Sequence, residues 1–71
     1  MPKLPHVSGS EAVRALQKLG FEVSRQKGSH IVMKRGADGS VIPNHQEIKI
    51  GTLAGALRQA GVSSEEFIAA L

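Results

Sequence analysis

One histidine of this chain lies in a basic stretch and could transfer a proton to or from an anionic substrate. His30 follows the turn-forming residues Gly28 and Ser29 and precedes a short apolar run. From residue 25 to residue 35 the chain has no acid and four cations: Arg25, Lys27, Lys34 and Arg35. An imidazole can exchange a proton near neutral pH, and clustered cations attract a polyanion. This combination indicates a protein that binds RNA or cleaves it.

RNA cleavage without a metal needs three steps that these residue types could supply. The 2′-hydroxyl must lose a proton, the charge on the phosphorane must be stabilised, and the 5′-oxygen must gain a proton. His30 could act as the general base or the general acid. Lys27 and Lys34 could hold the scissile phosphate region and stabilise its charge. The predicted RNA-binding residues are Arg25, Lys27, Ser29, Lys34 and Arg35.

A second histidine, His45, is the candidate for a further acid or base. If strands 29–35 and 40–44 pair antiparallel around a turn at 36–39, His45 falls opposite His30 within a residue or two. The alternative for His45 is a role in a cap or loop. For His30 the alternative is an inert, hydrogen-bonded histidine at the rim of a sheet, and His6 is given no role.

No cofactor and no metal are predicted. Three histidines, no cysteine and six carboxylates give no recognised zinc spacing. Glu22 is no nearer to His30 in the sequence than Asp38 is, and the two acids are not clustered, whereas a magnesium nuclease usually has clustered acids. A triad of Ser29 or Ser24 with His30 and Asp38 would be a chance collection of common residues.

The length and composition favour a small domain with an anionic partner. With 71 residues and a net charge of +3, the chain is expected to form one domain, residues 1–71. Phe21 and Phe67 are its only aromatic residues, which argues against a base-stacking platform. Apolar runs are far shorter than the roughly 20 residues that span a bilayer. A cytoplasmic protein without a membrane partner is therefore expected.

Helix and strand signals alternate clearly along the chain. A capping box formed by Ser8 and Glu11 opens the first helix, and Gly20 marks its end. Strands are predicted over 21–26, 29–35 and 40–44. A second helix contains Leu53, Ala56, Leu57 and Ala60 and ends at Gly61, and a capping box of Ser63 and Glu66 opens a short third helix.

Alternation in the second strand assigns its faces. Ile31 and Met33 fall on one side, while His30, Val32 and Lys34 fall on the other. Phe21 and Val23 are expected to share the helix-covered side with Ile31 and Met33. These elements predict an α+β fold of order α-β-β-β-α, with a three-stranded antiparallel sheet and a short extra C-terminal helix.

Several motifs together resemble the HicA family of toxins. They are Lys27-Gly28-Ser29-His30, Ile42-Pro43-Asn44-His45, Gly51-Thr52-Leu53, residues 59–63 and Glu65-Glu66-Phe67. The resemblance implies a double-stranded-RNA-binding-like fold and ribonuclease activity on messenger RNA, with His30 as the catalytic histidine. It also implies a HicB antitoxin that masks this histidine. We expect that antitoxin to be acidic and to cover the face that carries His30.

Two other readings predict different behaviour. A non-catalytic double-stranded-RNA-binding module would retain RNA without cleaving it, and it needs basic residues at a helix N-terminus. Residues 48–52, where the second helix starts, supply one cation. A domain that binds only protein would show no salt-dependent affinity for RNA.

Overall fold

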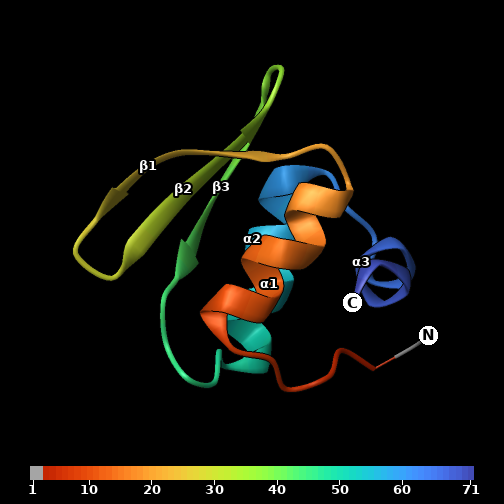
Figure 1. Cartoon of the computed structure of the whole chain (residues 1–71). Coiled ribbons are helices and arrows are strands. Elements are labelled where there is room, and N and C mark those ends of the chain that lie inside the picture. The colour runs from red at the N-terminus through yellow and green to blue at the C-terminus, as the bar shows by residue number, and fades with distance from the viewer. Residues whose placement is uncertain (1–2) are drawn as a thin grey trace.

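The computed structural model describes residues 3–71 and places helices against one side of a small sheet (Figure 1). In chain order the elements are α1 (Gly9–Lys18), β1 (Glu22–Lys27), β2 (His30–Arg35), β3 (Asp38–Pro43), α2 (Ile50–Ala60) and α3 (Ser64–Ala70). The sheet is antiparallel and has the order β1-β2-β3. The predicted α+β class, the α-β-β-β-α order and the short additional C-terminal helix are confirmed.

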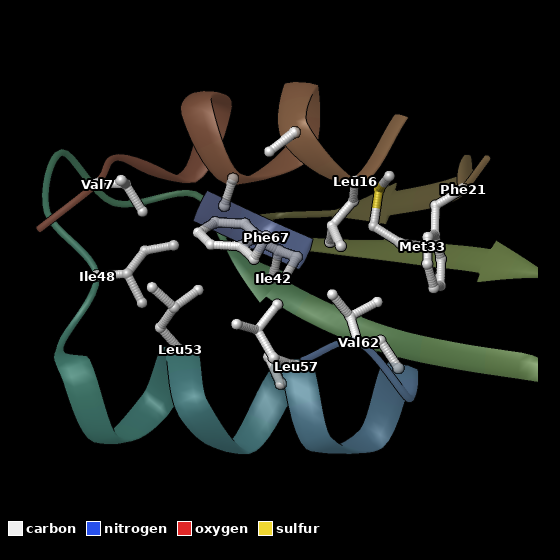
Figure 2. Close-up of a cluster of buried hydrophobic side chains, with 14 of the residues drawn as sticks. Val7, Leu16, Phe21, Met33, Ile42, Ile48, Leu53, Leu57, Val62 and Phe67 are labelled. Atoms are coloured by element: carbon white, nitrogen blue, oxygen red, sulfur yellow. The ribbon is translucent and has the colours of Figure 1, made fainter. Parts of the chain in front are cut away.

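The hydrophobic core lies where the three helices meet the sheet. Figure 2 shows Leu16 of α1, Leu57 of α2 and Phe67 of α3 clustered around Ile42 of β3. All four side chains are at most 2% exposed. Because each helix contributes its apolar stripe to the same cluster, burial of these side chains fixes the helices on one side of the sheet.

Helix ends follow the predicted signals. The Ser8 hydroxyl accepts a hydrogen bond from the Glu11 N–H, and the Glu11 carboxylate accepts one from the Ser8 N–H. A second capping box opens α3. After α1 and α2 the chain passes through Gly20 (φ 97°) and Gly61 (φ 73°), where a side chain would strain the backbone.

Both hairpins turn within two residues, and this corrects one prediction. The turns are Gly28–Ser29 and Gly36–Ala37, and each has a positive φ at its glycine only, which fits a type II′ hairpin. A four-residue turn at 36–39 was predicted. That prediction is wrong because one glycine at positive φ is enough to reverse the chain, so Asp38 and Gly39 join β3.

Strand β1 contains a β-bulge. Val23 pairs with Met33 and Arg25 pairs with Val32, which leaves Ser24 as the extra residue. Its pairing with Met33 places Val23 on the helix-covered side, as predicted, although Val23 is 43% exposed. Strand β1 is an outer strand that runs out beyond the helices, as Figure 1 shows. Phe21, just before β1, is buried as predicted.

Candidate functional site: the open face of the sheet

The sheet face that the helices leave uncovered carries His30. Along β2, Ile31 and Met33 are buried, whereas His30 and Lys34 are exposed, which confirms the predicted alternation. Directly paired residues of neighbouring strands lie on the same face, so the register extends this assignment across the sheet. We call this surface the open face. It comprises Glu22, Arg25, Lys27, His30, Val32, Lys34, Gly39, Val41 and Pro43.

Three cross-strand rows make up the open face, and charge is unevenly distributed over them. From the Gly28–Ser29 turn outward, the rows are Lys27–His30–Pro43, Arg25–Val32–Val41 and Glu22–Lys34–Gly39. The three cations of the face all lie on β1 and β2. The β3 side of the face carries no charge. The two rows nearest the turn therefore combine an imidazole with two cations and contain no acid.

The bulge at Ser24 decides which side chains of β1 share a face with His30. Beyond the bulge, Lys27 pairs directly with His30, and Arg25 lies in the adjacent row. If the ladder had continued unbroken from the start of β1, Gln26 would pair with His30. Both cations would then fall on the helix side, because a one-residue shift exchanges the two faces of a strand. One inserted residue thus brings two cations to the histidine.

The two lysines that were predicted to hold the scissile phosphate lie at different distances from His30. Lys27 is the direct cross-strand neighbour of His30, and such pairs have Cβ atoms about 4.5–5.5 Å apart. Lys34 is four residues along the same strand, which places its Cα about 13 Å from that of His30. Both side chains and the imidazole are exposed. Lys27 is therefore the lysine beside the imidazole, and Lys34 lies at the far row.

Arg35 lies on the other side of the sheet and forms part of the packing there. Its guanidinium donates a hydrogen bond to the Leu19 carbonyl oxygen at 2.9 Å and lies 4.5 Å above the Phe21 ring. It also pairs with the Asp38 carboxylate at 3.7 Å. These contacts join β2 to the end of α1, so the structure does not bring Arg35 to the open face. The predicted role of Arg35 in RNA binding is untested, and its contacts favour a structural role instead.

The register places His45 two residues beyond the position opposite His30, at the limit of the predicted range. Pro43 is the residue that pairs with His30. The offset of two residues came from the predicted four-residue turn. The Asn44 N–H still donates to the Ser29 carbonyl oxygen at 2.6 Å, which keeps this segment at the His30 end of the sheet. A catalytic role for His45 stays a prediction.

Backbone contacts attach the segment after β3 to the N-terminal part of the chain. The His45 carbonyl oxygen accepts a hydrogen bond from the Gly9 N–H at 2.8 Å, and the Ile48 N–H donates to the Val7 carbonyl oxygen at 2.8 Å. His6 is exposed in the N-terminal part of the chain, and its Nδ1 lies 3.7 Å from the carboxylate of Glu47, which belongs to the segment after β3. The contacts hold the start of α1 beside the end of β3.

Residues 3–71 contain neither a candidate metal-binding cluster nor a helix that could span a membrane. No group of three or more His, Cys, Asp or Glu side chains in that range is arranged to hold a metal ion. Glu22, the acid of the open face, sits in the row farthest from His30. In the same range no helix has the length and apolar character needed to cross a membrane.

An apolar column on the open face was not identified from the sequence. Val41, which is 43% exposed, pairs with the half-buried Val32, and Pro43 follows in the next row beside His30. Alternation in the sequence placed Val32 on this face beside His30 and Lys34, but the predicted face was not extended to Val41 and Pro43 of β3. Alternation from Ile42 places Val41 and Pro43 on the face opposite the core, so the signal was present.

Fold and site define a small α+β protein with helices on one face of a three-stranded sheet and a basic, histidine-bearing open face. Residues 9–62 match the family described as the HicA toxin of bacterial toxin–antitoxin systems. The chain belongs to the HicA toxin family. No curated protein matches the sequence. Membership makes the protein the toxin of a toxin–antitoxin system and implies an antitoxin partner.

Proposed function

We propose that this toxin is a ribonuclease that cleaves messenger RNA at the open face by acid–base catalysis from His30. The observation that carries the proposal is an exposed imidazole with a lysine directly across from it and no acid in its own or the adjacent row. Family membership supports it because the family consists of toxins. A positioned imidazole of this kind typically contributes 10²–10⁴-fold to the rate.

The geometry supports different roles for the two lysines. Lys27, paired with His30, is placed to stabilise the negative charge that develops on the phosphorane. Lys34 is too far along β2 to reach the same phosphate directly and would bind the chain one or more nucleotides away. Arg25, in the middle row, would neutralise a phosphate between them.

The same face is the surface that an antitoxin of the HicB type would cover. Its excess of cations favours an acidic partner, because complementary charge speeds association. An inhibitor that covers His30 and Lys27 blocks the reaction directly. An antitoxin docked wholly on the helices, with the open face left exposed, would contradict this part of the proposal.

Matched histidine variants test the proposal. Purified wild-type protein should cleave unstructured RNA in the presence of chelator, and His30→Ala should cleave it at least about 100-fold more slowly. His6→Ala removes another exposed imidazole away from the open face and should cleave at the wild-type rate. His45→Ala measures whether the second histidine contributes.

Two outcomes would overturn the proposal. One is cleavage of RNA by His30→Ala at the wild-type rate. The other is a wild-type protein that binds RNA without cleaving it. Induction in cells provides the matching assay: the wild type and His6→Ala should arrest growth, and His30→Ala should not.

A further inference from the structure

The open face has two chemically different halves. Arg25, Lys27 and Lys34 project from β1 and β2, whereas the β3 side is formed by Gly39, Val41 and Pro43 and carries no charge. Val41 is one of few large apolar residues that remain exposed in the described part of the chain. A surface that bound a polyanion through charge alone would not need the exposed apolar column formed by Val41, Val32 and Pro43.

A single RNA strand matches this division, because its phosphates and its bases project to different sides of the chain. Cations take the phosphates, and an apolar surface takes the faces of unpaired bases. A duplex would instead present sugars and phosphates to both halves of the face, since its bases are stacked inside. The column is aliphatic: both aromatic side chains, Phe21 and Phe67, are buried in the core.

We propose that a single RNA strand crosses the open face with its phosphates along β1 and β2 and a nucleobase packed on Val41 and Val32. The inference rests on the proposed ribonuclease function and adds the orientation of the substrate. Val41 lies one row from His30, so the base it contacts belongs to a nucleotide next to the cleaved bond. Aliphatic packing supplies little discrimination between bases, because every base offers an apolar face.

The chain contains a matched control for Val41. Val23 has the same exposed fraction, 43%, but its pairing with Met33 places it on the helix side of β1. Substitution of either valine by serine removes the same apolar groups from an exposed strand position. Only Val41→Ser alters the surface that the inference assigns to the base.

The experiment measures binding separately from cleavage. In a His30→Ala background, fluorescence anisotropy gives Kd for an unstructured RNA oligomer and for an abasic ribose-phosphate oligomer of equal length, over a series of salt concentrations. Val41→Ser should bind the RNA about three- to tenfold more weakly and bind the abasic oligomer normally. Val23→Ser should match the parent with both probes.

A cation variant gives the opposite signature. Arg25→Gln should weaken binding to both probes and lower the slope of log K against log salt concentration by about 0.7, the value for one phosphate of a single strand. Val41→Ser should leave that slope unchanged. The choice of probe and the salt dependence together distinguish the contribution of the cations to RNA binding from that of the apolar column.

The outcomes distinguish this inference from the proposed function. If Val41→Ser binds RNA as Val23→Ser does, or loses affinity for both probes equally, the orientation is overturned while the ribonuclease proposal stands. If neither the wild type nor the His30→Ala parent binds either probe, both are overturned. Urea unfolding confirms that each variant is folded, and Val41→Thr, which preserves shape and strand propensity, replaces the serine variant if that one unfolds.

Discussion

Arg35 provides the clearest test of the distinction between structural and RNA-binding cations. Replacement by glutamine removes three contacts: the hydrogen bond to the Leu19 carbonyl, the approach to the Phe21 ring and the ion pair with Asp38. A hydrogen bond from a charged donor contributes about 1.5–3 kcal/mol, with the lower end fitting a side chain that is 38% exposed. The ring contact adds about 0.5–1 kcal/mol.

The ion pair with Asp38 adds little, because its carboxylate is 52% exposed and water screens such pairs. Allowing for non-additivity among contacts that share one side chain, we expect Arg35→Gln to lower the free energy of unfolding by about 2 kcal/mol. That corresponds to a fall in Tm of roughly 8–16 °C for a domain of this size.

The assay pairs Arg35→Gln with Arg25→Gln, which makes the same chemical change on the open face. Urea unfolding followed by circular dichroism gives stability, and anisotropy at a temperature where both variants are folded gives RNA affinity. Arg35→Gln should lose stability and keep its affinity, whereas Arg25→Gln should do the reverse. If Arg35→Gln were as stable as the wild type and bound RNA as weakly as Arg25→Gln, the structural role assigned to Arg35 would be refuted.

Three further predictions concern the stability of the helices and sheet that support the open face. Ser40 is buried and donates to a carbonyl oxygen of α2 at 2.8 Å, so Ser40→Ala should cost about 1 kcal/mol in urea unfolding; an unchanged midpoint would contradict this. A Cβ on Gly9 would lie 2.5 Å from the Pro43 carbonyl oxygen, so Gly9→Ala should lower the free energy of unfolding by about 1–3 kcal/mol. Gly51→Ala is the control, because a Cβ there meets nothing within 4 Å and should not destabilise the protein in the same urea assay. Hydrogen bonds from the helix N-cap residue Ser8 lower the pKa of Glu11 below its ordinary 4.5. The ionised carboxylate of Glu11 therefore stabilises the fold above pH 4.5, and this stabilisation is lost as the pH falls through the lowered pKa. Unfolding measured over that pH range should show the loss in the wild type and not in Glu11→Gln.

Local signals in the sequence were sufficient for most of the frame. The capping box at Ser8 and the glycine at position 20 bound the first helix, and alternation around Ile31 assigned the faces of β2. These features depend on neighbouring residues alone, so they can be predicted without tertiary information. The same alternation placed His30 and Lys34 on one face.

Features that depend on register were less predictable. The segment after β2 has two glycines, Gly36 and Gly39, and these are compatible with a turn of two residues or of four. The four-residue turn was predicted, so the predicted partner of His30 was offset by two residues. The bulge at Ser24 lies in a wholly polar segment, where no apolar alternation reveals a change of phase. Pairing with β2 fixes that phase, and pairing is a tertiary property.

The same bulge has a consequence for how the protein behaves at high concentration. Strand β1 is an outer strand, and all six of its residues are exposed. Long, flat and apolar outer strands recruit further strands and start aggregates, whereas bulges and charges prevent this. Ser24 breaks the regular ladder of β1, and Glu22, Arg25 and Lys27 give it charge. The strand that supplies cations to the open face is thus also protected against edge-to-edge association.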